Sequence, residues 1–240
     1  MMNEASFGKK EATLIFSVLL FMAALAVADV TSVKLAAIDL FGIGLLVPVG
    51  TLAFALTFLA TDIISELYGK QYSVYTVWGG VAMRIFMLVY FYVSIGDAQG
   101  NFLFFEVPQF WSEESQRAYS FIFGSTLYIY LAGFVAIIVS SLLDVYLFHY
   151  FKEKHQGKPM LWFRNNFCTI VSQLINSTLF ISIAFGSVLT VRDILAAVAG
   201  QFVAKIILAI FDTPFCYAAC NYGGGKGDWY AFWGRSFWAR

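Results

Sequence analysis

Long apolar segments separated by short charged ones fill most of this chain, and they predict membrane-spanning helices. Six helices are predicted, over residues 12–38, 40–69, 73–95, 118–151, 162–190 and 194–219. A helix of about 20 apolar residues crosses the ~30 Å hydrocarbon core of a bilayer. The pattern therefore predicts an all-α integral membrane protein, with a single six-helix domain over residues 1–220 and an aromatic, basic tail over 221–240.

The second predicted helix contains residues that interrupt a regular helix. Its first half holds Gly42, Gly44, Pro48 and Gly50. Proline removes a backbone donor and clashes with the preceding turn. Irregular backbone at membrane depth is tolerated only where protein or a cavity covers it, and transporters place binding sites at such breaks. We therefore expect a kinked or partly unwound helix that borders a site.

The fourth predicted helix is too long for one straight crossing. Its 34 residues, 118–151, would extend about 51 Å at the helical rise, against a hydrocarbon core of ~30 Å. It is therefore expected to tilt, project or break. Gly124 and Gly133 are the predicted places for a break.

A polar stripe runs along the fifth predicted helix. Thr169, Ser172, Gln173 and Asn176 are spaced at i, i+3, i+4 and i+7, which places them on one helical face. The preceding helix repeats the motif, because IVSSLLDVYLF at residues 138–148 matches IVSQLINSTLF at 170–180 in six of eleven positions.

The repeat aligns Asp144 with Asn176, and Ser141 with Gln173. Since the two helices are predicted to be antiparallel neighbours, these polar groups should lie within about one helical turn of the same depth. They form either the walls of a binding cavity or a set of helix–helix hydrogen bonds.

Ionisable residues inside predicted spans are costly in lipid and indicate partners within the bundle. Asp29, Asp62, Arg84 and Lys205 are such residues, and Arg164 stands at the start of the polar-striped helix. Arg84 requires a carboxylate. We predict Asp62, on the neighbouring antiparallel helix, as that partner. These five residues either form structural ion pairs or take part in proton coupling or substrate contact.

Glu66 closes the second predicted helix, in the sequence TDIISELYGK. Lys70 follows it by four residues, a spacing that allows an ion pair. Glu66 is therefore either part of an ordinary charged helix end or a residue that contacts substrate.

The distribution of Lys and Arg predicts that both termini are cytoplasmic, since ten lie in predicted inside segments and two in outside segments. The net charge of zero gives no basis for a nucleic-acid partner. The three cysteines lack metal-site spacing, so no cofactor or metal is predicted. The lipid bilayer is the expected environment, and a homo-oligomer is compatible with the sequence.

Four segments resemble the queuosine precursor transporter family, which belongs among the vitamin uptake transporters. They are residues 47–70 (VPVGTLAFALTFLATDIISELYGK), 142–148 (LLDVYLF), 161–186 (LWFRNNFCTIVSQLINSTLFISIAFG) and 205–217 (KIILAIFDTPFCY). The resemblance implies a multi-pass inner-membrane protein that imports 7-cyano-7-deazaguanine and 7-aminomethyl-7-deazaguanine, the precursors of queuosine and archaeosine in tRNA.

Two positions depart from this family. Asn176 stands where the family usually has Asp, and Ser141 stands where it often has Gln. The cavity therefore carries one negative charge fewer than is typical, which argues against a preference for the cationic aminomethyl substrate.

A deazaguanine suits the polar motif chemically. Asp144 could accept hydrogen bonds from N1–H and the 2-amino group, while Gln173 or Asn176 could donate to O6. The other predicted substrate-binding residues are Ser141, Ser172, Glu66 and Trp78. The candidates for stacking on the flat ring are Trp78, Trp162 and Phe180.

Two other functions fit the sequence less well. A substrate-binding component of an energy-coupling vitamin transporter would use an A-x-x-x-A patch on its first helix, which Ala24 and Ala28 match. An intramembrane enzyme would need an activated group, and the chain has no HExxH or G-x-S-x-G motif. We therefore predict a transporter and no enzyme, with the driving force left open.

Overall fold

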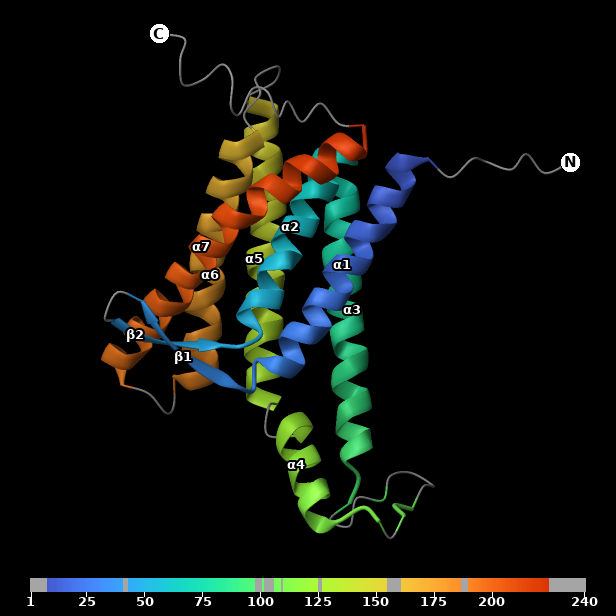
Figure 1. Ribbon diagram of the computed structural model, residues 1–240, viewed down its shortest axis with the longest axis vertical. Helices are drawn as coiled ribbons and strands as arrows, with labels where there is room; N and C mark the ends of the chain where they lie inside the picture. The colour runs from blue at the N-terminus through green and yellow to red at the C-terminus, as the bar shows by residue number, and fades with distance from the viewer. Residues whose placement is uncertain are drawn as a thin grey trace, which may run out of the picture.

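The computed structural model describes residues 8–40, 43–97, 101, 106–108, 110–124, 127–154, 161–186 and 190–224 of the 240 residues. The chain order of its elements is α1 (Lys9–Thr31), β1 (Leu35–Leu40), β2 (Ile43–Pro48), α2 (Thr51–Leu67), α3 (Lys70–Ile95), α4 (Glu113–Gly124), α5 (Leu127–Lys154), α6 (Leu161–Phe185) and α7 (Val191–Tyr222). The long helices run roughly side by side as one bundle (Figure 1).

The lengths and composition of these helices confirm a helical, multi-pass membrane protein. α1, α3, α5 and α6 are long and apolar enough to cross a bilayer. α7 is a fifth candidate if its two parts, bent by 40°, form one span. α2 has 17 residues, so the predicted count of six spans stays a prediction.

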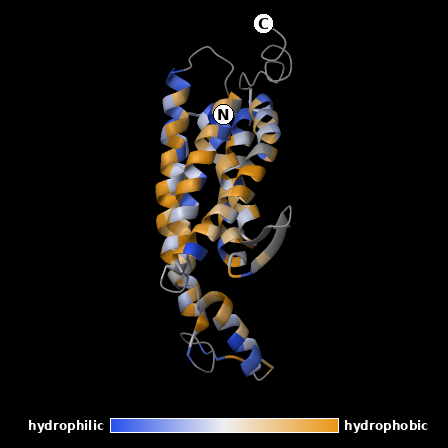
Figure 2. Ribbon diagram, turned by 90° about the vertical axis from the view of Figure 1, so that its left-hand side faces the viewer, coloured by the Kyte–Doolittle hydropathy of each residue, from blue (hydrophilic) through white to orange (hydrophobic). Residues whose placement is uncertain are grey.

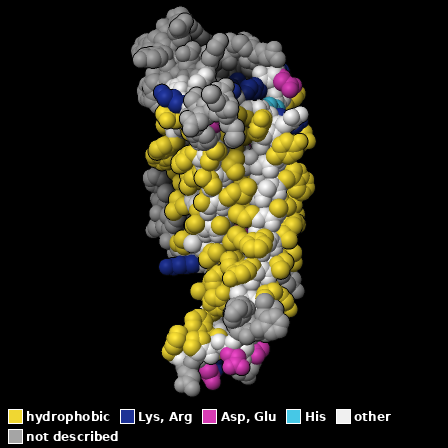
Figure 3. Space-filling model, turned by 90° about the vertical axis from the view of Figure 1, so that its right-hand side faces the viewer, with side chains coloured by type: hydrophobic (Ala, Val, Ile, Leu, Met, Phe, Trp, Pro, Cys, Tyr) yellow, Lys and Arg dark blue, Asp and Glu magenta, His cyan; other side chains and the backbone are white. Residues whose placement is uncertain are grey.

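The outer surface agrees with this environment. Apolar residues dominate the helices between their ends (Figure 2). On one face they form a wide apolar band, with Lys and Arg side chains gathered near the end at which α1 begins (Figure 3). We call this the terminal end, because α7 also finishes there: Lys9 Nζ lies 5.4 Å from the centre of the Tyr222 ring. The placement of this end in the cytoplasm stays a prediction.

Residues 35–48 differ from the predicted helices. The first helix was expected to reach residue 38 and the second to begin at 40, but β1 and β2 form an antiparallel hairpin here. Glycine and proline weaken a helix in this segment, and pairing between the strands satisfies the backbone groups instead. The interruption itself was therefore predicted correctly, but its form as a kinked helix was wrong. β2 packs against α7.

The expected break of the fourth predicted helix near Gly124 stays a prediction, because residues 125 and 126 lie outside the described residues. α4 ends at Gly124 and α5 begins at Leu127. Gly133 lies within the continuous α5, so no break occurs there. Glycine at this position leaves room for the Arg84 side chain, because a Cβ here would lie 2.6 Å from Arg84 Nη2.

The predicted hairpin of polar-motif helices is confirmed, since α5 and α6 pack together as antiparallel neighbours (Figure 1). One apolar cluster joins α2, α5, α6 and α7, and it includes Cys168, Cys216 and Cys220. All three cysteines are free and buried, as expected for small apolar side chains. A second cluster joins α1, α2, α3 and α5 around Phe21.

Gly80 sets the close approach of α3 to α1. A Cβ at this position would lie 2.5 Å from Phe21 Cε1 and 3.1 Å from Leu25 Cδ2, and both of these side chains are fully buried. At the adjacent Gly79, a Cβ would meet only the flexible end of Met22, at 3.0 Å.

Replacing Gly80 with alanine should therefore destabilise the bundle by about 1–3 kcal/mol, the usual cost of overpacking. Thermal unfolding of the detergent-solubilised protein measures this effect. Gly79→Ala is the matched control and should lower the melting temperature much less. Equal losses in both variants would contradict the tight α1–α3 contact at Gly80.

Candidate functional site

A column of polar side chains runs through the bundle from the terminal end towards its middle. On α6 it passes from Arg164 through Thr169 to Asn176, which is about 18 Å at the helical rise. Facing side chains on α2, α5 and α7 complete it, and most of them are buried. In an apolar bundle such groups must find partners inside the protein.

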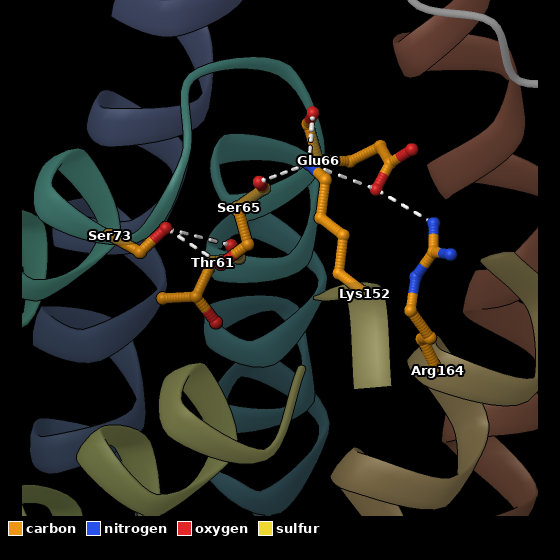
Figure 4. Close-up of polar contacts among 6 residues, drawn as sticks. All are labelled: Thr61, Ser65, Glu66, Ser73, Lys152 and Arg164. Atoms are coloured by element: carbon orange, nitrogen blue, oxygen red, sulfur yellow. Dashed lines mark hydrogen bonds and ion pairs between the residues drawn. The ribbon is translucent and has the colours of Figure 1, made fainter. Parts of the chain in front are cut away.

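Glu66 organises the column at the terminal end (Figure 4). Its Oε2 accepts a hydrogen bond of 2.9 Å from Arg164 Nη2 and lies 3.3 Å from Lys152 Nζ. Lys152 also donates to the backbone carbonyls of Ser65 and Glu66, at 3.0 and 2.7 Å. These carbonyls belong to the last turn of α2, where carbonyls lack helical partners. The cluster thus joins α2, α5 and α6.

Lys70 does not pair with Glu66 as the sequence suggested. Its Nζ lies 3.6 Å from the centre of the Tyr146 ring instead. α3 begins at Lys70 after the positive-φ residue Gly69. That turn separates Lys70 from the last turn of α2, so the two residues do not share one continuous helix and the i, i+4 spacing does not bring them together.

The next layer places two carboxyl groups together. Asp62 Oδ2 accepts a hydrogen bond of 3.3 Å from Thr169 Oγ1. Asp144 is fully buried and lies next to both Asp62 and Ser172. Within the described part of the chain, neither oxygen of Asp144 meets the geometric criteria for a hydrogen bond, and the same holds for Ser172 Oγ and for Gln173 Oε1. Buried polar atoms are rarely left in this state, so they indicate a place for a proton, water or ligand.

Asparagine side chains connect α6 to α7 beside this layer. Asn166 Nδ2 donates to Thr213 Oγ1 at 2.9 Å, and Asn165 Nδ2 donates to Asp212 Oδ1 at 3.4 Å. Pro214 lies within α7 next to these contacts. Because proline removes one helical hydrogen bond, side-chain contacts from α6 help to hold α7 in this region.

Lys205 forms the following layer, deeper in the bundle. Its Nζ donates a hydrogen bond of 2.7 Å to Asn176 Oδ1 and lies 5.0 Å from the centre of the Phe54 ring. Asn176 Nδ2 in turn donates to Ser140 Oγ at 3.0 Å. Lys205 is only 2% exposed. One lysine thereby links α2, α5, α6 and α7.

Arg84 pairs with Asp29, so the predicted pairing with Asp62 was wrong. Its Nε donates to Asp29 Oδ2 at 2.6 Å, and its Nη2 donates to Asp29 Oδ1. Asp62 lies five residues before the end of α2, whereas Arg84 lies fourteen residues after the start of α3. The two side chains therefore differ in depth by about 13 Å, which explains the error.

The Lys205 and Arg84 layers enclose a central cavity. Its empty volume, counted with its open mouth, is about 510 Å³. Six helices contribute to its lining: α1, α2, α3, α5, α6 and α7. The polar and aromatic lining residues are Asp29, Ser32, Thr51, Phe54, Arg84, Tyr130, Asn176, Phe180, Gln201 and Lys205.

The structure brings together only part of the predicted substrate set. Asn176 lines the cavity, and the predicted stacking candidate Phe180 does too. Asp144, Ser141, Ser172 and Gln173 are buried in the column between the cavity and the terminal end. Glu66 lies in the ion-pair cluster, and Trp78 is 49% exposed on the outside of α3. Trp162 has a side chain outside the described residues.

Five of the polar and aromatic cavity residues were not predicted from the sequence: Ser32, Thr51, Phe54, Tyr130 and Gln201. Gln201 precedes Lys205 by four residues, so both lie on one face of α7. A polar residue at that spacing from a buried lysine was the signal that could have identified it. Phe54 gave no such signal, because it stands among many apolar residues of α2. Among the described residues, no cluster of His, Cys, Asp or Glu could hold a metal.

Comparisons with known proteins add an independent line of support. The sequence profile of a family described as "Putative vitamin uptake transporter" matches residues 48–219. A Bacillus subtilis (strain 168) protein named "Probable queuosine precursor transporter" is 30% identical over 182 residues, which cover 76% of this chain and 74% of that protein. No solved structure matches. The matched family range contains every column and cavity residue from α2 to α7, while Asp29 and Ser32 precede it.

Replacing Asp29 with asparagine should leave Arg84 buried without a counter-charge. Breaking a buried pair in this way costs about 3–5 kcal/mol, which thermal unfolding of the purified protein would detect. The double variant Asp29→Leu/Arg84→Met should recover much of that loss, because it removes both charges.

The control is the exposed pair of Arg117 and Glu113, whose side chains are 82% and 89% exposed. Glu113→Gln should change the melting temperature little, since exposed pairs contribute little. A loss with Asp29→Asn no greater than that with Glu113→Gln would contradict a structural role for the buried pair.

Proposed function

Since the chain belongs to the vitamin uptake transporter family and is a multi-pass membrane transporter, we propose that it imports queuosine precursors across the inner membrane. The proposed substrates are the 7-deazaguanines that carry a cyano or an aminomethyl group. The relative named as a queuosine precursor transporter supports this choice. The structural observation that carries it is the polar cavity between six helices, joined to a column of unpartnered acceptors.

The cavity offers what a flat, polar heterocycle needs. Phe54 and Phe180 supply aromatic faces for stacking. Gln201 Oε1 is buried without a hydrogen-bond partner, so it can accept from the N1–H or the 2-amino group. Lys205 can donate to O6. From the sequence, Asp144 was expected to accept the hydrogen bonds from N1–H and the 2-amino group. In this proposal Gln201, which lines the cavity, accepts them instead.

Asp144 and Gln173 keep a proposed role in substrate passage. A transporter exposes its site to one side of the membrane at a time, so substrate has to leave the cavity along polar groups. The unpartnered oxygens of Asp144 and Gln173 are the acceptors next to the cavity in the direction of the terminal end. Ser141 and Ser172 are buried at the same level. We propose these four residues as the exit path.

The structure does not favour a substrate-binding component of an energy-coupling transporter. The A-x-x-x-A patch would have to face a partner protein. Ala24 and Ala28 are 5% and 3% exposed within the bundle, and Ala28 lines the cavity. These two alanines therefore pack inside the bundle, where a partner protein would not reach them.

Uptake should be measured in cells that cannot synthesise the deazaguanine precursor, with queuosine in tRNA as the readout. The chain should restore queuosine when the precursor is supplied. Gln173→Ala and Asn176→Ala should each lower uptake about tenfold or more, since losing a buried hydrogen-bonding group costs about 1–3 kcal/mol.

Asn221→Ala serves as the control for this experiment, because Asn221 is exposed near the end of α7. It should leave uptake unchanged, with all variants compared at equal membrane abundance. Failure of the unaltered chain to restore queuosine would refute the proposed substrates. Normal uptake by both cavity and column variants would refute the proposed site.

The pair of Asp62 and Asp144 is proposed to couple transport to protons. Both carboxyl groups are buried and lie beside each other, and an ionised carboxylate can only accept hydrogen bonds. A proton on one of them would turn this contact into a hydrogen bond. The neighbouring ionisable groups are Asp212, Cys168 and Cys216. None of the ion pairs found among the described residues involves either carboxylate.

Uptake into proteoliposomes should therefore be faster when the outside is more acidic than the lumen. Asp62→Asn and Asp144→Asn should abolish this acceleration, because an amide cannot take up and release the proton. Exchange of labelled for unlabelled substrate should persist in at least one of these variants. Asp193→Asn, which alters an exposed residue at the start of α7, should keep the acceleration. If the uptake rate of the unaltered protein does not depend on the pH gradient, proton coupling is ruled out.

A further inference from the structure

Lys205 lies in the cavity without a counter-charge. Its only polar contact of hydrogen-bonding geometry among the described residues is with Asn176 Oδ1, at 2.7 Å, and the Phe54 ring lies below its Nζ at 5.0 Å. None of the ion pairs in the described part of the chain includes it. An amide oxygen and an aromatic face stabilise an ammonium group, but neither neutralises it.

The other charged groups of the cavity do not compensate for Lys205. Asp29 is the one carboxylate among the cavity-lining residues, and Arg84 is the other cation. Both Asp29 oxygens accept hydrogen bonds from Arg84, so this carboxylate is already neutralised. Counted with ordinary protonation states, the lining residues therefore carry one positive charge in excess.

We infer that this cavity selects neutral ligands that carry a hydrogen-bond acceptor and rejects ligands that carry an ammonium group. Lys205 is the selecting residue, and Asn176 is the neighbour that leaves its charge uncompensated. The inference rests on the proposed function, and it divides the two proposed substrates: the cyano compound should bind and the aminomethyl compound should be excluded.

Charge is the first reason for this selection. A second cation in the cavity would either repel the Lys205 ammonium or force it to release its proton, and both outcomes cost binding free energy. For two like charges about 6 Å apart at an effective dielectric constant of about 20, the penalty corresponds to a ratio of dissociation constants on the order of 100-fold.

Hydrogen-bond polarity is the second reason. A nitrile nitrogen can accept a hydrogen bond from the Lys205 ammonium, whereas a protonated aminomethyl group offers only donors. Asn176 corrects this mismatch only in part, since its Nδ2 already donates to Ser140 and its Oδ1, which already accepts from Lys205, has a single lone pair left beside that ammonium. A cationic ligand would therefore leave donors facing donors in a buried site, which is unfavourable.

The test is the dissociation constant of each 7-deazaguanine for the purified full-length protein in lipid nanodiscs, measured by calorimetry at neutral pH. The unaltered protein should bind the cyano compound on the order of 100-fold more tightly than the aminomethyl compound. Asn176→Asp keeps the shape of the side chain and places a carboxylate against Lys205. It should strengthen binding of the cation and bring the ratio near unity.

Two further variants make the result decisive. Lys205→Met removes the excess charge by another route and should also reduce the ratio, which keeps the test valid if Asn176→Asp does not fold. Asn221→Asp adds a carboxylate at an exposed position and should leave the ratio unchanged.

The possible failures are distinguishable. Equal affinity of the unaltered protein for both compounds would overturn the charge selection and leave the proposed function in place. A folded Asn176→Asp variant that keeps the original ratio would overturn the role of Lys205 and Asn176. If neither compound binds the unaltered protein, the proposed function fails and this inference fails with it.

Discussion

The bundle has to satisfy its polar side chains from within, because its helices present a wide apolar band on the face seen in Figure 3. It does so in successive layers. Glu66 pairs with Lys152 and Arg164 near the terminal end, and Arg84 pairs with Asp29 at the far side of the cavity. Each of these contacts joins different helices, so the helices are held in register mainly where charges meet. The layers between them contain buried oxygens that have no hydrogen-bond partner among the described residues.

The interruption after α1 contributes to the shape of the cavity. The β1–β2 hairpin occupies residues that would otherwise lengthen α1 or α2, so α1 ends and α2 begins beside the cavity. Gly50, at the start of α2, approaches α1 so closely that a Cβ there would lie 2.2 Å from the Ala28 carbonyl oxygen. Glycine is thus required by this contact. Gly50, which weakens a helix in this segment, therefore also allows α1 and α2 to pack closely along one side of the cavity.

Local patterns were sufficient to predict the parts of the structure that depend on a single helix or on two neighbours. The stripe of Thr169, Ser172, Gln173 and Asn176 is buried as expected, and α5 and α6 form the predicted antiparallel pair. The partner of Arg84 could not be predicted in the same way, because Asp29 lies on α1, and its depth relative to Arg84 depends on how α1 packs against α3. The contact between Lys205 and Asn176 depends on how α7 packs against α6, which no spacing within one helix specifies.

The sequence of charges along the column explains why amides occupy its middle. Positive Lys205 and the acidic pair Asp62 and Asp144 are all buried in one bundle, yet no ion pair connects them. The Lys205 ammonium donates a hydrogen bond to Asn176 instead. A direct ion pair between Lys205 and Asp144 would join α7 to α5 at a desolvated site, where removing either partner is strongly unfavourable. An amide contact is weaker than such a pair and leaves both carboxylates outside any ion pair found among the described residues, so the helices are held together less firmly at this level than at the charged layers.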